Sequence, residues 1–293
     1  MMRDLQKLLD ELKNDRSLGE PDRLRQRLDA LDSLDAFVLD GEAPEESELL
    51  GGDDSRLRAR SLYARLEAAN CEPYERIRLE IQKGGGRESL LPWLRDRTVG
   101  GGEDEFEKGQ GYDYLDELIS GVLQFPAPEG ASVELEPEMV FYQPTPARHI
   151  FDLIGRTGLT EQDVLIDIGS GLGHVPMLVS ICTLARCVGI ELQTAYVECA
   201  RFTAQQLKLD NVTFLDQDVR AADLSRGTVF YLYTPFTGSM LRAVLDRLRT
   251  ESGKRGIRIC TFGPCTTTVA YERWLRALDA SDEDRIAVFR SRD

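Results

Sequence analysis

Leucine-rich patterns of helical spacing occupy the first 125 residues of the chain. In the first pattern, apolar side chains at i, i+3, i+4 and i+7 share one helix face: Leu5, Leu8, Leu9 and Leu12. Three similar patterns follow, and they begin at Leu24, Leu57 and Leu115. Glycine-rich segments separate them, at 51–52, 84–86 and 100–102. A proline-rich segment at 126–130 ends the region, so we predict a helical domain over 1–125 and a linker over 126–140.

Beyond residue 140, short apolar runs alternate with helical patterns, which is typical of a parallel sheet covered by helices on both faces. The runs that predict strands lie at 164–168, 187–191, 212–215, 228–233 and 257–262. The helical patterns follow Thr145-Pro146 and then lie at 239–250 and 271–278. A last apolar run at 286–289 predicts an edge strand. The predicted fold class is therefore α/β, with a Rossmann-like, mostly parallel sheet over 141–293.

Charge is distributed unevenly between these two parts. The chain has 36 Lys and Arg residues and 51 Asp and Glu residues, a net charge of −15. Residues 141–293 contain 18 of each sign, so the 18 basic and 33 acidic residues left in 1–140 carry the whole excess. An acidic surface repels phosphate backbones, which disfavours direct nucleic-acid binding. It could attract a basic protein or a cationic small molecule, although solubility alone also explains it.

The composition favours a cytoplasmic protein. No stretch approaches the roughly eighteen apolar residues of a membrane span, and the first residues lack the pattern of a signal peptide. None of the six cysteines forms a C-x-x-C pair, and only two histidines are present. We therefore expect no disulfides, no metal site and no membrane association.

The most informative segment is 164–174, which reads Val-Leu-Ile-Asp-Ile-Gly-Ser-Gly-Leu-Gly-His. A strand pattern containing Asp167 leads into a glycine turn with the spacing G-x-G-x-G, and a helical pattern follows. Glycines allow a sharp turn and let a ligand approach the backbone closely. His174 stands where the dinucleotide fingerprint G-x-G-x-x-G requires its third glycine, which disfavours a nicotinamide-dependent oxidoreductase.

Two further strands are also followed by acidic residues. The strand at 187–191 ends in Glu191, whose carboxylate could accept two hydrogen bonds from a ribose diol. The strand at 212–215 is followed by Asp216 and Asp218. Three strand–acid units in series, with a glycine turn after the first, indicate a site for a nucleoside-containing ligand.

This order of motifs resembles that of the class I S-adenosylmethionine-dependent methyltransferases. The resemblance implies that Asp167 binds the amino group of the cofactor's methionine part and that Glu191 binds the ribose. It also implies that Asp218, with Asp216 as the alternative, binds the adenine amino group. The same resemblance assigns further cofactor contacts to Gly169, Ser170, Gly171, Gly173 and Val219. Members of this class usually add a sixth and a seventh strand, for which 286–289 is the one clear candidate here.

The acceptor loop of such folds follows the fourth strand, which here leads into Tyr233-Thr234-Pro235-Phe236. Amino-group methyltransferases often carry Asn/Asp-Pro-Pro-Tyr/Phe there, and only Pro235 and Phe236 match that pattern. We expect Tyr233, Thr234 and Phe236 to form the acceptor wall. A plain loop with a helix-starting proline is the alternative interpretation.

Over residues 140–265 the resemblance narrows to the non-SET histone-lysine methyltransferase family, on the segments 166–174, 189–191 and 229–232 with the aromatic Phe236. That family closes a loop over its cofactor at the position of 141–145, which implies contacts from Tyr142, Gln143 and Thr145. The family's asparagine pair after strand four has no counterpart in this chain, nor has its basic nucleosome-binding tract. Segment 109–114 is a second candidate cover because glycines flank aromatic residues there.

The sequence thus predicts an S-adenosylmethionine-dependent methyltransferase. We expect direct displacement of the methyl group, without a metal, onto a protein side chain or a small molecule that the sequence does not identify. The alternative is a non-catalytic, S-adenosylmethionine-binding regulatory module, because the acceptor loop departs from the familiar pattern.

Overall fold

The computed structural model describes residues 2–38, 54–95, 111–130, 134–279 and 281–292. Two compact units divide the chain, Met1–Ile77 and Arg78–Asp293. The observed division lies well before the boundary at 125 that the helical patterns predicted, so the helices at 86–95 and 114–123 belong to the unit that contains the sheet. The predicted glycine-rich breaks at 51–52 and 100–102 lie outside the described residues.

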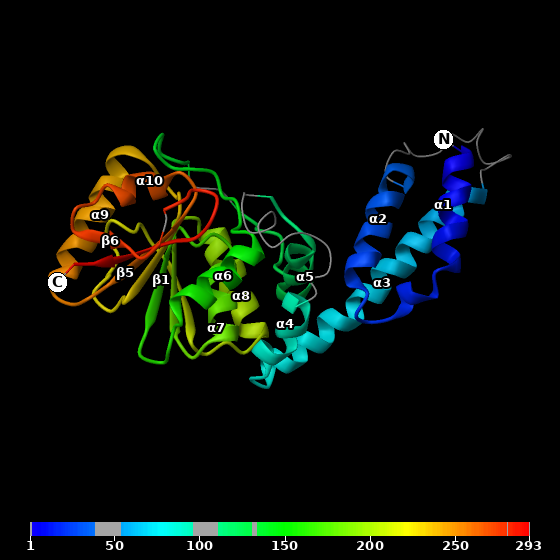
Figure 1. Cartoon of the computed structure of the whole chain (residues 1–293), viewed down its shortest axis with the longest axis horizontal. Helices are drawn as coiled ribbons and strands as arrows, with labels where there is room; N and C mark the ends of the chain where they lie inside the picture. Colours follow the sequence, from blue (N-terminus) through cyan, green and yellow to red (C-terminus); the bar gives the residue numbers. More distant parts are fainter. Residues whose placement is uncertain (1, 39–53, 96–110, 131–133, 280, 293) are drawn as a thin grey trace. The chain divides into compact units, whose positions relative to one another are not determined.

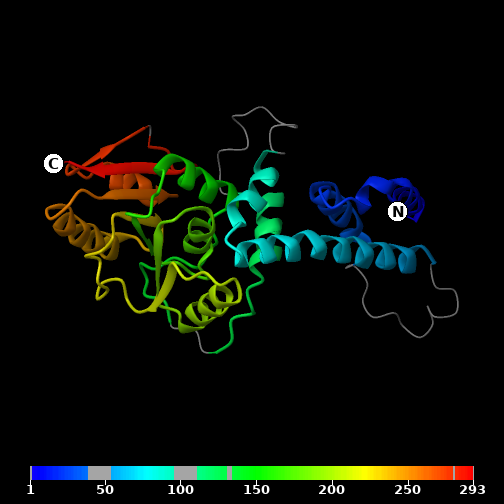
Figure 2. The same cartoon turned by 90° about the horizontal axis from the view of Figure 1, so that it is seen from below.

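The first unit is helical. It contains α1 (Met2–Asn14), the short 3-10 helix η1 (Arg16–Gly19), α2 (Leu24–Val38) and most of α3 (Asp54–Gln82). Figure 2 shows α3 as one uninterrupted helix, although Pro73 lies inside it. Of the predicted leucine positions, Leu5, Leu9, Leu31, Leu62 and Leu66 lie in its core, together with Leu34. Leu57, where the third pattern was predicted to begin, is 65% exposed and does not contribute to that core.

A buried arginine lies within this first unit, and the leucine pattern gives no sign of it. The Arg27 guanidinium donates to Asn70 Oδ1 at 2.5 Å and to the backbone carbonyls of Leu18 and Pro21 at 3.2 Å each. Burial lowers the pKa of Arg27. The carbonyl contacts satisfy the charged group, which would otherwise be costly to bury.

The second unit is built on a seven-stranded sheet with the order β3-β2-β1-β4-β5-β7-β6. The strands are β1 (Val164–Ile168), β2 (Arg186–Glu191), β3 (Val212–Asp216), β4 (Val229–Tyr233), β5 (Arg258–Phe262), β6 (Leu275–Ala277) and β7 (Ala287–Ser291). The first five run parallel, and β7 is antiparallel to both β5 and β6. This confirms the predicted α/β fold with a mostly parallel, Rossmann-like sheet.

Two expectations near the C-terminus were wrong. The helix expected at 271–278 is absent, because 275–277 forms β6, and the preceding helix α10 (Cys265–Ala270) ends before that segment. The run at 286–289 contributes to β7, which lies between β5 and β6 and is therefore not an edge strand. The chain accordingly supplies both additional strands. Antiparallel pairing with β7 buries Leu275 in the core, and this tertiary contact overrides the helical spacing of the apolar residues.

Helices cover both faces of the sheet (Figure 1). One face carries α6 (Ala147–Thr157), α7 (His174–Cys182) and α8 (Thr194–Gln206), and the other carries α9 (Gly238–Ser252) and α10. Helix α4 (Gly86–Arg95) packs against α7, and α5 (Tyr114–Leu123) packs against α6. Within the described residues, no helix has the length and apolar character that crossing a membrane would require.

This topology fixes where a ligand can bind. The order of the parallel strands reverses between β1 and β4, since the chain winds outward to β2 and β3 on one side and to β5 on the other. In open sheets of this kind the carboxyl ends of the strands at the reversal leave a crevice.

Candidate functional site

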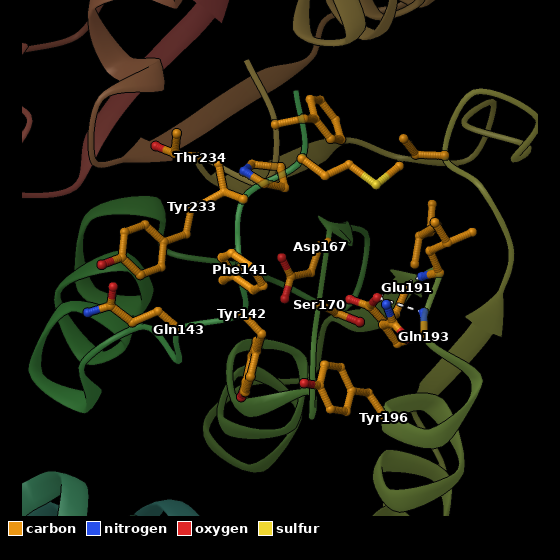
Figure 3. Close-up of a pocket in the computed structure, with 18 of the residues that line it drawn as sticks. Phe141, Tyr142, Gln143, Asp167, Ser170, Glu191, Gln193, Tyr196, Tyr233 and Thr234 are labelled. Carbon is orange, nitrogen blue, oxygen red and sulfur yellow. Dashed lines mark hydrogen bonds between the residues drawn. The ribbon is translucent and has the colours of Figure 1, made fainter. Parts of the chain in front are cut away.

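A cavity of about 590 Å³ opens at the carboxyl ends of β1, β2 and β4 (Figure 3). Twelve of the fourteen site residues predicted from the sequence line it: Tyr142, Gln143, Thr145, Asp167, Gly169, Ser170, Glu191, Asp218, Val219, Tyr233, Thr234 and Phe236. The other two, Gly171 and Gly173, belong to the turn that forms one of its walls. Asp216, the alternative adenine contact, is exposed at the end of β3 and does not line the cavity.

The glycine turn is conformationally demanding. Gly169, Gly171 and Gly173 have φ values of +78°, +53° and +88°, a region that other L residues rarely adopt. A Cβ on Gly169 would lie 2.6 Å from Pro235, and one on Gly173 would lie 2.5 Å from Phe214. The turn therefore packs against β3 and against the acceptor loop, so that both sides of the cavity depend on it.

The glycine position at 171 has a further constraint. A Cβ there would collide with the aromatic ring of Tyr142, which lies directly against the turn. Close approach of the chain to itself, in addition to close approach of a ligand, thus requires glycine at this position.

Asp167 lies at the end of β1 and points into the cavity (Figure 3). Only 3% of its surface is exposed. Burial and the neighbouring Glu191 carboxylate raise the pKa of Asp167 well above its ordinary value. A cationic group of a ligand would relieve this cost, because an opposite charge favours the ionised carboxylate.

The Glu191 carboxylate, at the end of β2, is held by three backbone amides. Its Oε2 accepts from the Gly171 N–H at 2.8 Å, and its Oε1 accepts from the N–H groups of Leu192 and Gln193 at 2.8 and 2.9 Å. These bonds fix the carboxylate at the cavity wall and couple it to the glycine turn. Three of the four lone-pair positions of the carboxylate are thus occupied, which leaves one on Oε2 for a ligand hydroxyl.

Asp218 is engaged by a cation that the sequence analysis did not consider. Arg220 donates from Nε to Asp218 Oδ2 at 2.9 Å and from Nη2 to the same oxygen at 2.5 Å. The same Nη2 donates to Glu136 at 2.6 Å, and these bonds lower the pKa of Asp218. Arg220 thereby links the loop after β3 to the segment that precedes the predicted cover.

Residues 138–145 run across the cavity and are anchored at several points. The Val140 N–H donates to the Pro235 carbonyl at 3.1 Å, and the Thr145 and Tyr231 hydroxyls hydrogen-bond at 2.9 Å. Thr145 therefore supports the segment from below and does not cap α6 through its side chain. We call residues 138–145 the cover segment.

Glu138 anchors the start of the cover segment to a second helix. Its carboxylate accepts from the backbone N–H groups of Ser239 and Met240 at 3.0 and 2.8 Å and so caps α9, whose own N-cap residue makes no side-chain cap bond. These hydrogen bonds lower the pKa of Glu138. The cover segment is thus tied to the acceptor loop that leads into α9.

Helix α5 supports the other end of the cover segment. Asp116 accepts from the Asp113 N–H and the Ala147 N–H at 2.7 Å each, so one carboxylate caps α5 and α6 together. The Tyr112 hydroxyl donates to the Pro144 carbonyl at 2.9 Å. Of the second candidate cover, 109–110 lies outside the described residues, while Tyr112 contacts the first cover.

The acceptor side of the cavity is formed by the loop that follows β4. Tyr233 is half-buried and stacks on Phe262 at a centroid distance of 4.7 Å, and burial raises its pKa to about 12. Thr234 has φ +39°, and its hydroxyl donates to the Phe262 carbonyl at 3.2 Å and accepts from the Cys265 N–H at 3.0 Å. Its side chain thus braces the loop. Phe236 lines the cavity but belongs to the hydrophobic core.

Several lining residues escaped the sequence analysis. Four of them are His174, Gln193, Tyr196 and Tyr231, and the exposed Phe141 lines the rim with 84% of its surface accessible. Tyr196 and Gln193 follow the acid after β2, so their closeness to Glu191 along the chain was the available signal. Tyr231 lies two residues before Tyr233 in β4, so both side chains lie on the same face of the strand, and this spacing was the available signal.

The polar groups that line the cavity fit S-adenosylmethionine. Ser170 Oγ is buried at the cavity wall and has no hydrogen-bond partner in the described structure. The lining contains the carboxylates of Glu134, Asp167, Glu191 and Asp218 and no Lys or Arg among the described residues. Such a lining suits a ligand that carries a sulfonium, an ammonium group and several hydroxyl donors, and it disfavours phosphorylated cofactors.

Comparison with known proteins gives one family match. The profile of the family described as histone methylation protein DOT1 matches residues 139–230, which include all of the cover segment but its first residue, the glycine turn and strands β1 to β3. The match spans less than half of the chain. No curated protein sequence matches.

Solved structures with similar folds include methyltransferases of diverse substrates. An RNA methyltransferase from Salinibacter ruber, in complex with S-adenosyl-L-homocysteine, is 28% identical over 51% of this chain and 92% of its own, with a TM-score of 0.40. A putative S-adenosyl-L-methionine-dependent methyltransferase from Methanococcus maripaludis is 13% identical over 49% and 84%, with a TM-score of 0.39. A geranyl diphosphate C-methyltransferase from Streptomyces coelicolor A3(2) is 19% identical over 40% and 43%, with a TM-score of 0.33.

The family match, the strand order and the glycine turn with its acids together identify the catalytic class. The chain contains a class I S-adenosylmethionine-dependent methyltransferase domain, its cofactor half resembles the non-SET histone-lysine methyltransferases, and S-adenosylmethionine is the cofactor.

Proposed function

We propose that this methyltransferase transfers a methyl group to an amino group of a basic protein, and that it does so in the cytoplasm. The observation that carries the proposal is the lining of the cavity, which presents carboxylates and aromatic rings and no cationic side chain among its described residues. Such a cavity attracts an amine and repels the phosphates of nucleic acids or phosphorylated metabolites. The histone methylation family matched by residues 139–230 supports a protein acceptor.

The cofactor would be held by residues from four segments. Asp167 would accept from its ammonium group, Glu191 from its ribose, and Asp218 and Val219 would lie against the adenine. Ser170 would donate its free hydroxyl, and the turn formed by Gly169, Gly171 and Gly173 would place its backbone against the ligand. Tyr142, Gln143 and Thr145 would cover the methionine end. These assignments rest on the placement of the side chains around one cavity.

When bound, S-adenosylmethionine supplies an electrophilic methyl group on a sulfonium sulfur, for direct displacement by a lone pair of the acceptor. The task of the chain is to orient that acceptor and to exclude water. Tyr233 and Phe236 would form the acceptor wall, and Thr234 would hold the loop in its strained conformation through its two hydrogen bonds. Exclusion of water from the acceptor amine would disfavour its ammonium form and so favour the neutral amine that carries the lone pair.

The acidic excess in 1–140 adds a second reason for a basic acceptor. The described first unit presents exposed acids on α1 and α2, among them Glu11, Asp29 and Asp32. Long-range attraction of a cationic partner would raise its rate of encounter and would weaken at high salt. The three acids named all belong to the first unit.

The experiment is a transfer assay with methyl-labelled S-adenosylmethionine and a graded panel of acceptors. Mixed core histones serve as the basic protein, and the same histones with their amines blocked by acetylation serve as the matched control. A low-mass polyamine and transfer RNA complete the panel. We expect label in the untreated histones only, with the signal falling as salt increases.

The other outcomes separate the competing functions. Label in the polyamine alone would replace the protein acceptor by a cationic small molecule. Label in RNA would contradict the charge argument. Tight binding of S-adenosylmethionine without transfer to any of the four would favour a non-catalytic regulatory module.

A further inference from the structure

His174 occupies the position of the third fingerprint glycine, and the cofactor assignments leave it without a role. It is the first residue of α7 and directly follows the glycine turn. Its Nδ1 lies 3.1 Å from the Tyr142 hydroxyl of the cover segment.

Rings from four segments stack around this contact. Phe125, just after α5, packs on His174 with centroids 4.7 Å apart, and Tyr142 packs on Tyr196 of α8 at 5.1 Å. Figure 3 shows the Tyr142 and Tyr196 rings side by side below Asp167. Phe125 thus restricts the motion of the His174 ring, and Tyr196 restricts the motion of the Tyr142 ring.

Both partners of this hydrogen bond are neutral near pH 7. Burial lowers the pKa of His174 to about 4, so the imidazole is neutral near pH 7. Burial raises the pKa of Tyr142, whose hydroxyl also receives a hydrogen bond from the Leu172 backbone. A neutral imidazole has one acceptor nitrogen, and at Nδ1 it can receive the phenol proton. The imidazole then carries its own proton on Nε2.

The contact lies where the cover segment meets the turn. The Tyr142 ring lies directly against Gly171, and the Gly171 N–H donates to Glu191. A displacement of the Tyr142 ring would therefore shift the Gly171 backbone and, through its N–H, the Glu191 carboxylate that is proposed to bind the ribose. The anchors at Val140 and Thr145 hold the ends of this stretch, while the hydroxyl of Tyr142 holds its middle.

We propose that His174 is a positioning residue that accepts a hydrogen bond from Tyr142 on Nδ1 and thereby holds the cover segment closed over the cofactor. The proposal rests on the proposed covering role of Tyr142 and extends it to a residue that does not itself need to touch the cofactor.

A double-mutant cycle on the full chain tests it. The variants are Tyr142→Phe, His174→Leu and the double variant, and the measured quantity is the Kd of S-adenosylhomocysteine by titration calorimetry. Each single change removes the same hydrogen bond and should weaken binding about threefold to tenfold. The Kd of the double variant should be no more than about twofold higher than that of the single variant with the higher Kd, because the hydrogen bond can be lost only once.

Two further variants guard against a general loss of packing. His174→Asn keeps an acceptor near the position of Nδ1 and should restore binding to within about threefold of the wild type. Tyr271→Phe removes the hydroxyl of a ring that is 82% exposed and does not line the cavity, so it should leave Kd unchanged. Thermal unfolding of each variant reports any loss of the fold.

The outcomes separate the two proposals. Additive losses in the cycle, or wild-type binding by His174→Leu beside weakened binding by Tyr142→Phe, would overturn the role of His174 alone. Wild-type binding by Tyr142→Phe would remove the covering role of Tyr142 and this inference with it. Failure of a folded His174→Asn variant to recover binding would likewise count against an acceptor at that position.

Discussion

The two sides of the cavity are built differently. On the cofactor side, the glycine turn, Glu191 and the ends of β1 and β2 are joined by backbone hydrogen bonds, so the geometry belongs to the main chain. On the acceptor side, Tyr233 projects from the end of β4, and Phe141 stands 84% exposed at the rim. A main-chain geometry allows few substitutions, whereas an aromatic wall can change without disturbing the sheet.

The cover segment joins these two sides. It bonds to the acceptor loop through Val140, to the start of α9 through Glu138 and to the cofactor side through Tyr142. Glu136, just before the cover segment, bonds to Arg220, which in turn bonds to Asp218. A change on one side can therefore reach the other through it. Mutations that spare the cover segment should separate cofactor binding from acceptor binding.

The largest effect should come from Gly171→Val. The new side chain would collide with Tyr142, and φ +53° is unfavourable for a branched residue. We expect S-adenosylhomocysteine to bind more than about 100-fold more weakly, which corresponds to about 2.7 kcal/mol, by calorimetry on a variant with native circular dichroism. Gly158→Val is the matched control, because Gly158 has the same φ of +53° and no atom within 4 Å of its Cβ. Equal binding by the two variants would show that the contact with Tyr142 is irrelevant.

Glu191→Ala should follow in size. The variant loses the proposed ribose acceptor and leaves three backbone N–H groups without their carboxylate. The expected cost of roughly 1.5–3 kcal/mol weakens both S-adenosylmethionine and its demethylated product about 10-fold to 150-fold. Glu198→Ala, at an exposed position on α8, serves as the control. Unchanged affinity in a folded Glu191 variant would take this residue out of the site.

On the acceptor side, Tyr233→Ala should lower kcat/KM for the acceptor about tenfold, or about 1.4 kcal/mol. The ring lines the cavity and packs on Phe262 on the acceptor side, so the Kd of S-adenosylhomocysteine should stay within about threefold. Tyr271→Ala, on the exposed surface, provides the comparison in the same transfer assay. A parallel loss of cofactor affinity would erase the distinction between the two sides.

The smallest effect should appear in stability, through Asp167→Asn. The pKa of Asp167 is raised in the folded protein, so its carboxyl group favours folding below its unfolded value of about 3.8, and that contribution is lost as pH rises through the folded pKa. The Asn variant has no such loss. Its Tm without ligand should therefore exceed that of the wild type at neutral pH, with the difference shrinking on acidification, while its affinity for S-adenosylhomocysteine falls. A Tm difference that is constant with pH would contradict this account.

Local sequence patterns predicted the cofactor side because its elements are short and continuous. The strand, the acid and the glycine turn of 164–174 stand next to one another in the chain, and β1 is observed where it was predicted, at Val164–Ile168. The acids at the ends of β2 and after β3 were visible for the same reason. Their arrangement around one cavity follows from parallel strands whose carboxyl ends share an edge.

Long-range contacts decided what the patterns missed. The spacing of Tyr271, Trp274 and Leu275 predicted a helix, yet pairing with β7 made 275–277 a strand. The leucine pattern of α5 revealed a helix but could not reveal that Asp116 would cap α6 from a distance of 31 residues. No pattern of neighbouring residues indicates that two such distant segments will be in contact.

The sequence by itself determined the α/β fold, the cofactor class and the order of the acids, because each depends on residues that are neighbours along the chain. Only the tertiary structure decided that Arg220 reaches Glu136, that Thr234 turns its hydroxyl away to brace the loop, and that His174 meets Tyr142. These contacts arise where segments separated in sequence are packed together, and the free energy that selects them comes from that packing rather than from local propensity.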